Sequence, residues 1–198
     1  MTLNTSIYVL GQVDHRRLFV ECNKLIGAHE GIRFEDRQDG RWQDGEHIPA
    51  PGSPWSIFNE IDQGLCALLD VHYRPDGPLH AGTSHWDDCD PGCDYAPHLQ
   101  AHWLHVSFDT AYGYRGDNGE GCGDLHARLV AQLGQWLDRQ GIGWKWQNEF
   151  TGEIHDRYDG LTELRSGGAE ASDWFRDIVR PAIVARLAFE SPGTATRG

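Results

Sequence analysis

Four residues between positions 89 and 102 have the side chains and the spacing of a small zinc site. They follow the pattern C-x3-C-x4-H-x3-H and are Cys89, Cys93, His98 and His102. Zinc binds four thiolate or imidazole ligands in a tetrahedron, and short loops can supply them. His80 and His85 are substitute ligands. The alternative is an acidic surface loop with reduced cysteines, because the spacing departs from that of a zinc knuckle.

A second polar group lies on a segment whose alternation predicts a half-buried strand. A strand projects His105, Ser107 and Asp109 to one side, since they lie two residues apart. His105-Val106-Ser107 resembles one half of the paired His-x-Ser/Thr signature of two-histidine phosphoesterases, where one histidine is the base and the other the acid. The chain has no second copy of that motif, and His155 is the nearest substitute. The alternative is a solvated sheet face.

The glycine-rich loop 113–123 leads from this strand into a helix, for which Asp124 is the expected N-cap. Backbone N–H groups at such a place often bind anions, but the acidic residues here oppose a phosphate. Asp117, Asn118 and Glu120 offer oxygen ligands for a divalent cation. The alternative is a connecting loop.

Two further pairs have both a chemical and a structural interpretation. Cys122 and His126 lie one helical turn apart, a spacing that suits a nucleophilic cysteine and its base. The alternative is that Cys122 is a small buried thiol. Trp144 and Trp146 share one strand face. Such a pair can either stack nucleobases, as in single-strand binding proteins, or pack in the core. Core packing is the simpler interpretation, because the preceding helix offers an apolar stripe.

The composition limits the function classes. The chain has 198 residues and a formal net charge of −13, from 30 acidic and 17 basic residues. Duplex nucleic-acid binding is not expected, because it relies on clustered Lys and Arg, whereas an acidic surface suits a basic protein partner. The start of the chain lacks a signal-peptide pattern, and no apolar run approaches the roughly 18 residues of a membrane span. With an odd number of cysteines, this predicts a cytoplasmic protein with reduced thiols.

Periodicity predicts the elements that position these residues. Strands are expected at 6–10, 104–109, 144–150 and around 154, and helices at 14–26, 55–68, 124–139 and from Ser172 through a kink at Pro181. The connection 28–53 predicts a hairpin or a functional loop. The unit from 102 to 150 favours a crossover between parallel strands, which a further strand can separate.

These elements predict one α+β domain over residues 1–190, followed by a disordered tail at 191–198. Its mixed sheet of about four to six strands packs against three or four helices. The sequence does not indicate an oligomeric state.

Several segments of the C-terminal half resemble a widespread group of actinobacteriophage proteins of unknown function. They are HVSFDTAYGYRG, GCGDLHARLVAQLGQWLD, GWKWQNEFTGEIH and GGAEASDWF, within residues 104–183. The resemblance implies a phage-encoded protein in the host cytoplasm and assigns a role to no residue. We therefore expect a non-enzymatic accessory protein that binds a host or phage protein through an acidic surface. The alternative is a zinc-binding domain, or a metal-dependent hydrolase or phosphoesterase, that uses the Cys/His loop or the His105 strand face.

Overall fold

The N-terminal segment forms the strand on which the sheet is built. In β1 (Thr2–Val9) every second side chain is fully buried, and the strand pairs antiparallel with one neighbour on each side. The structure is a computed structural model that describes residues 2–26, 36–38, 40–44, 46–49, 53–61, 67–79, 102–116, 118–148 and 150–190.

Seven strands form the main sheet, in the order β2-β5-β6-β7-β1-β8-β9, and all neighbours are antiparallel. The other six strands are β2 (Asp36–Gln38), β5 (Trp55–Ile61), β6 (Ala67–Tyr73), β7 (Leu104–Ala111), β8 (Trp144–Asn148) and β9 (Ile154–Asp156). A separate hairpin pairs β3 (Gly40–Gln43) with β4 (Glu46–Pro49). The predicted α+β class is confirmed, with a sheet wider than expected.

The sheet is antiparallel rather than mixed because each crossover skips one strand. β7 and β8 run parallel and are joined by α3 (Cys122–Arg139), and β1 lies between them, the arrangement that the sequence left open. In the same way β1 and β6 run parallel with β7 between them. Along the chain, β1 is followed by α1 (His15–Leu25), and the strands β2 to β5 come before β6. The central part of the sheet is thus a split β-α-β arrangement of two interleaved units.

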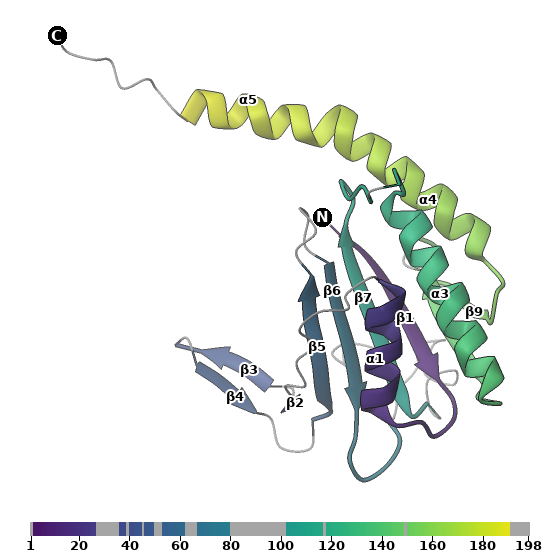
Figure 1. Ribbon diagram of the computed structural model, residues 1–198. Helices are drawn as coiled ribbons and strands as arrows, with labels where there is room; N and C mark the ends of the chain where they lie inside the picture. The colour runs from purple at the N-terminus through teal and green to yellow at the C-terminus, as the bar shows by residue number, and fades with distance from the viewer. Residues whose placement is uncertain are drawn as a thin grey trace.

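The helices α1 and α3 lie against the same face of the sheet (Figure 1). The N-cap of α1 is Asp14, as predicted, and its carboxylate accepts from the backbone N–H of Arg17 at 2.7 Å. The space beneath the helices is filled by large side chains, which include Trp144 and Trp146, so the core interpretation of these tryptophans is confirmed. Gly134 of α3 is required there, because an added Cβ would lie 2.1 Å from the Trp144 ring.

Residues 55–68 were predicted as a helix, and this prediction is wrong. Residues 55–61 form β5, and β6 begins at Ala67. Trp55, Phe58 and Ile61 recur at helical spacing, but the segment also fits the strand period, and Ile57 is fully buried in the sheet. The pairing with β6 decides between two patterns that the sequence supports equally.

Two predicted helix caps are also wrong. α3 begins at Cys122 with Gly121 as its N-cap, so Asp124 lies in the first turn. Ser172 lies inside α4 (Leu161–Trp174), where its hydroxyl is buried and donates to the carbonyl oxygen of Tyr112 at 2.8 Å. Serine is tolerated there because its side chain has a partner outside the helix.

The helix α4 continues beyond the sheet toward the C-terminus (Figure 1). A π-helical segment η1 (Phe175–Val179) joins it to α5 (Arg180–Glu190), so the irregularity predicted at Pro181 takes the form of a wider turn just before the proline. The predicted tail 191–198 lies outside the described residues. Within the described chain, no helix is both long enough and apolar enough to cross a bilayer.

Candidate functional site

The face of the sheet opposite α1 and α3, here called the polar face, carries a row of polar side chains. In antiparallel pairing, register partners project to the same side. One set of partners crosses all seven strands and consists of Arg37, Ser56, His72, His105, Tyr8, Lys145 and Asp156. We call this set the histidine row. It places residues from distant parts of the sequence side by side.

His105 lies at the centre of this row, on β7. Its ring is stacked on Tyr8 with centroids 5.1 Å apart and on His72 with centroids 5.4 Å apart. The ring of His102 stands edge-on at 6.4 Å from His105 and at 5.4 Å from Tyr8. Three imidazoles and a phenol therefore surround one point of the polar face.

His105 is also the most unusual side chain of the row. Only 3% of it is exposed, and neither ring nitrogen has a hydrogen-bond partner among the described residues. Desolvation, together with the positive charge that His72 and His102 would carry, holds the pKa of His105 well below the usual 6.5. The ring is therefore neutral at pH 7, with one donor and one acceptor unused. Such a group costs stability and calls for an explanation.

Ser107 and Asp109 share the polar face with His105, as strand alternation predicts, but they do not form a triad with it. Both are held by Asn4, whose side-chain amide donates to Ser107 Oγ and to Asp109 Oδ1, each at 2.9 Å. Desolvation raises the pKa of Asp109, and the bond from Asn4 opposes this. Asn4 therefore orients the two oxygen-bearing side chains.

The structure does not bring His155 to this group. His155 is the register partner of Trp146, so it projects to the helix-covered face, where its ring stacks on the indole at 5.0 Å. The second histidine of the polar face is instead His72, which sequence analysis did not single out. The alternation of Leu69, Val71 and Tyr73 was the available signal, and it places His72 on the opposite side of β6.

The proposed zinc ligands are only partly described. His102 is buried beside Tyr8 and His105, whereas Cys89, Cys93 and His98, with the substitutes His80 and His85, lie outside the described residues. Among the described residues, no three His, Cys, Asp or Glu side chains are arranged to hold a metal ion. A zinc site at His102 would therefore need ligands from outside the described residues.

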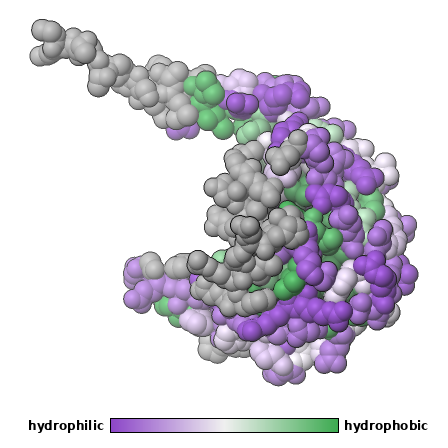
Figure 2. Space-filling model, in the orientation of Figure 1, coloured by the Kyte–Doolittle hydropathy of each residue, from purple (hydrophilic) through white to green (hydrophobic). Residues whose placement is uncertain are grey.

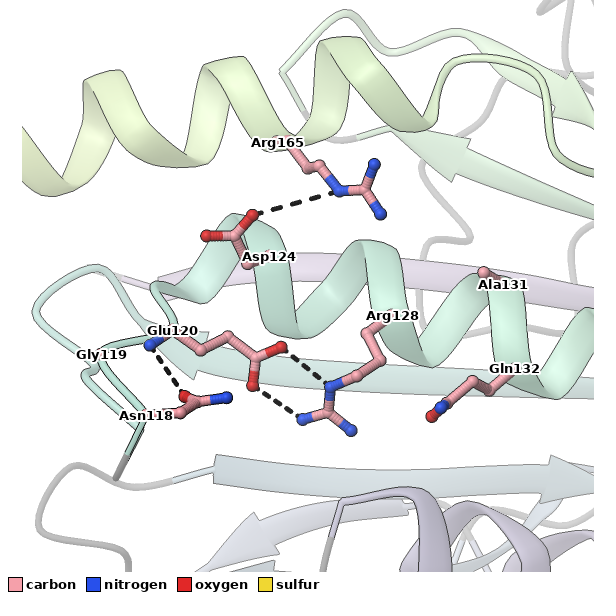
Figure 3. A pocket seen from close by; sticks show the side chains of 8 residues that line it. All are labelled: Asn118, Gly119, Glu120, Asp124, Arg128, Ala131, Gln132 and Arg165. Atoms are coloured by element: carbon pink, nitrogen blue, oxygen red, sulfur yellow. Dashed lines mark hydrogen bonds and ion pairs between the residues drawn. The ribbon is translucent and has the colours of Figure 1, made fainter.

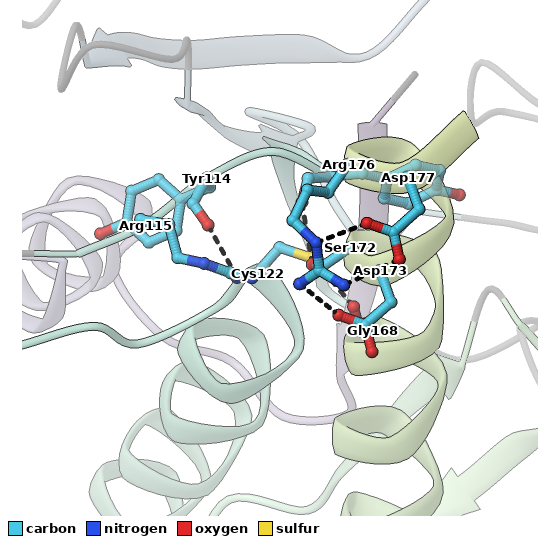
Figure 4. Close-up of polar contacts among 9 residues, drawn as sticks. Tyr114, Arg115, Cys122, Gly168, Ser172, Asp173, Arg176 and Asp177 are labelled. Atoms are coloured by element: carbon cyan, nitrogen blue, oxygen red, sulfur yellow. Dashed lines mark hydrogen bonds and ion pairs between the residues drawn. The ribbon is translucent and has the colours of Figure 1, made fainter. Parts of the chain in front are cut away.

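Cys122 and His126 do not form a nucleophile and base pair. Both nitrogens of His126 are bonded, to Thr5 Oγ1 at 2.6 Å and to Thr110 Oγ1 at 3.0 Å, and burial lowers its pKa to about 3. The sulfur of Cys122 lies 3.7 Å from the carbonyl oxygen of Gly168 and 3.5 Å from Ser172 Oγ (Figure 4). Desolvation raises the pKa of this thiol, so the thiolate is disfavoured.

An open depression of about 610 Å³ lies where the glycine-rich loop meets α3 and α4 (Figure 3). Glu120, one of the candidate cation ligands, makes two 2.8 Å hydrogen bonds to Arg128. Asp124 Oδ1 lies 4.0 Å from Arg165 Nε. Asp117 lies outside the described residues. Each acid among the described lining residues faces an arginine, so these residues offer no surplus charge to attract an ion.

Comparisons of the chain with protein-family models, with curated proteins and with solved structures found no match. The split β-α-β arrangement occurs with many activities and assigns none by itself. Function must therefore be argued from the side chains of this chain.

Proposed function

We propose that the protein acts by binding another protein, and that residues 174–190, here called the arm, make the contact. The observation that carries this proposal is the exposure of large apolar side chains on the arm. Trp174 is 44% exposed, Ile178 60%, Ile183 48% and Val184 59%. On the face drawn in Figure 2, the coloured part of the projecting helix has hydrophobic as well as hydrophilic atoms, and the outer surface of the body is mostly hydrophilic.

The exposed side chains favour a partner for two physical reasons. Burying one large aliphatic or aromatic side chain is worth about 1.5–3 kcal/mol, and several lie together here. In addition, α5 makes no extensive contact with any described element except η1, so this end of the continuous helix lacks the tertiary packing from which most helical stability in proteins comes. A partner that covers the arm would supply the missing packing.

The charge of the chain adds to the proposal. The arm contains three arginines, one aspartate and one glutamate, for a net charge of +1, so the other residues carry −14. The acidic body suits a partner with a basic region, and the arm suits a partner with an apolar groove. The resemblance to phage proteins supports a phage-encoded accessory protein in the host cytoplasm as the setting.

The test is photo-crosslinking with benzoylphenylalanine placed at position 178, with the same probe at the exposed position 162 of α4 as the matched control. A partner crosslinked only from position 178 is then purified and titrated against the wild-type chain. We expect direct binding that Ile178→Asp weakens at least about tenfold, equal to roughly 1.4 kcal/mol, and that Thr162→Asp leaves unchanged. Equal binding by Ile178→Asp would contradict the proposal.

A second candidate function is acid–base or metal-assisted hydrolysis at the polar face. The unpaired nitrogens of His105, beside His72, favour it, because two neighbouring imidazoles can serve as base and acid toward a phosphoester. In the zinc version, Cys89, Cys93, His98 and His102 would hold the ion.

This candidate is tested with a model phosphodiester and with metal analysis of the purified chain. His105→Gln should abolish hydrolysis, and His155→Gln, on the other face, should not. Bound zinc lost in Cys93→Ser would support the metal version. A metal-free chain without hydrolytic activity would eliminate this candidate.

A further inference from the structure

Two buried donors occupy neighbouring positions on the helix-covered face of β8. Trp146 and Asn148 are two residues apart and project to the same side, and neither residue is exposed to solvent. The indole nitrogen Nε1 of Trp146 and the amide nitrogen Nδ2 of Asn148 have no hydrogen-bond partner among the described residues. Buried polar groups are bonded in the great majority of cases, so two unbonded donors this close in the sheet call for an acceptor.

The amide of Asn148 cannot be turned to remove the mismatch. Its Oδ1 accepts from the backbone N–H of Phe150 at 3.0 Å, and a turned amide would place two donors against each other. The backbone N–H of Asn148 donates to the carbonyl oxygen of Glu153 at 3.0 Å, and its carbonyl oxygen accepts from Gly152 at 2.7 Å. The chain thus satisfies the other three polar groups of this residue, and Nδ2 is the group left over.

Trp144 shows how an indole is satisfied elsewhere on the same face. Its Nε1 donates to Asp138 Oδ1 at 3.1 Å. An indole nitrogen and a side-chain amide nitrogen can only donate, so Trp146 and Asn148 both require an acceptor. The ring of His155 is stacked on Trp146, and its Nε2 is also unbonded within the described chain. An imidazole nitrogen can accept as well as donate, so His155 does not belong to the donor pair.

We infer that the Trp146 and Asn148 donors bind a small monovalent anion, of the size of chloride, beneath α4. Two donors suit an anion better than a water molecule, because a buried water must also place its own two protons on acceptors. Both donors are neutral, so they can hold a single charge but do not balance a multivalent ion in a buried place. This site is separate from the arm and does not depend on the proposed function.

The packing of α4 limits the ligand to a small one. The helix touches residues on both sides of the donor pair, and each contact falls on a glycine. A Cβ added to Gly160 would lie 2.5 Å from the ring of His155, and one added to Gly167 would lie 2.5 Å from the ring of Phe150. His155 is the register partner of the tryptophan, and Phe150 follows the asparagine by two residues. The helix therefore approaches this end of the sheet too closely for a large ligand.

The start of α4 adds a favourable potential. Its N-cap is Gly160, which makes no side-chain cap bond, so the first N–H groups carry the positive end of the helix dipole toward His155 and the donor pair. Two acids oppose an anion here: Glu163 in the first turn, and Glu153, whose Oε2 lies 3.8 Å from His155 Nε2. Both acids are exposed, so water and salt weaken their effect, whereas the donors act in a buried place.

The indole N–H resonances of two tryptophans test the inference in the wild-type chain. Chloride replaces gluconate at constant ionic strength, so that the general effect of salt stays the same. We expect the resonance of Trp146 to move with a saturable dependence on chloride, and bromide to act in the same way. The resonance of Trp144, which is bonded to Asp138, should stay nearly constant. A change without saturation, or an equal change of both resonances, would overturn the inference.

Matched variants separate the donor from the ring that carries it. Trp146→Phe removes the donor and should raise the dissociation constant for chloride at least about tenfold, followed at the side-chain amide resonance of Asn148. Trp144→Phe, on the same face of the same strand, should leave that constant unchanged. Asn148→Asp adds a negative charge and should abolish binding. Near-UV circular dichroism verifies the fold of each variant, and unchanged binding in a folded Trp146→Phe would contradict the site.

Crystals grown in bromide locate the ion, because bromide scatters anomalously. An anomalous peak within hydrogen-bond distance of both Trp146 Nε1 and Asn148 Nδ2 would support the site. A water molecule at this place without an anomalous signal, or bromide only at the protein surface, would overturn it. Either result leaves the test of the arm unaffected, so the two proposals fail separately.

Discussion

His126 and His105 are both buried imidazoles, and they lie on opposite sides of the sheet. His126 belongs to α3 and packs against the helix-covered face, whereas His105 belongs to β7 and projects from the polar face. Each nitrogen of His126 has a threonine hydroxyl as its partner, whereas neither nitrogen of His105 has one within the described part of the chain. Burial lowers the pKa of both rings, so a lowered pKa alone does not distinguish them. The comparison teaches that hydrogen-bond satisfaction separates a structural histidine from a candidate for function.

The largest effect should come from two neighbouring residues of β7 that face opposite ways. Phe108 is fully buried against His126, with centroids 4.6 Å apart, and Phe108→Ala should cost about 3–5 kcal/mol of unfolding free energy. Ser107→Ala removes one hydrogen bond from Asn4 and should cost no more than about 1.5 kcal/mol. Urea titration measures both. Similar costs would show that the two faces are equally packed.

The next effect is the dependence of stability on pH. The pKa of His126 is about 3 in the folded chain and about 6.5 when unfolded. Between these two pH values the unfolded state binds more protons than the folded state. The free energy of unfolding is therefore unaffected by protonation of His126 above about pH 6.5, and it falls as the pH drops below this value. At pH 4.5 the loss should reach about 2–3 kcal/mol. The free energy of unfolding, measured by urea titration above pH 6.5 and again at pH 4.5, should fall less in His126→Gln than in the wild type. In that variant only His105 and other groups still make stability depend on pH.

The smallest effect gives the sharpest contrast between the faces. His126→Leu leaves the buried hydroxyls of Thr5 and Thr110 without this partner and should cost about 1–3 kcal/mol. His105→Leu replaces an unpaired polar ring by an apolar side chain and should change stability by less than about 1 kcal/mol, in the stabilising direction. Thermal unfolding of the two variants provides the measurement. A large cost for His105→Leu would mean that this ring is structural as well.

The sequence was sufficient where one pattern dominated. The strand at 104–109, the helix after the glycine-rich loop and the tryptophan strand were all predicted, because their periods are clear and their lengths suit each element. The α4 helix was harder, since Gly167 and Gly168 are poor helix formers. They are present because Phe150 and Gly123 approach the helix too closely for a side chain.

The histidine row could be predicted only in part. Strand alternation placed His105, Ser107 and Asp109 on one side, which required no knowledge of the rest of the chain. Tyr8 and His72 join them because β1 and β6 flank β7 in one particular register. Registers between strands so far apart in sequence depend on the packing of the whole core, so local patterns do not contain them.

The π-helical segment at 175–179 has a geometric consequence for the arm. The backbone N–H of Arg180 bonds the carbonyl oxygen of Phe175, five residues back instead of four, so this turn holds one extra residue. Five residues in this turn advance about as far around the helix axis as four residues in an α-helical turn. Deleting a single residue there would therefore shorten the arm by one residue while its apolar side kept roughly its direction relative to the body, whereas a deletion within α5, which has no extra residue to lose, would rotate the residues after it by roughly 100°.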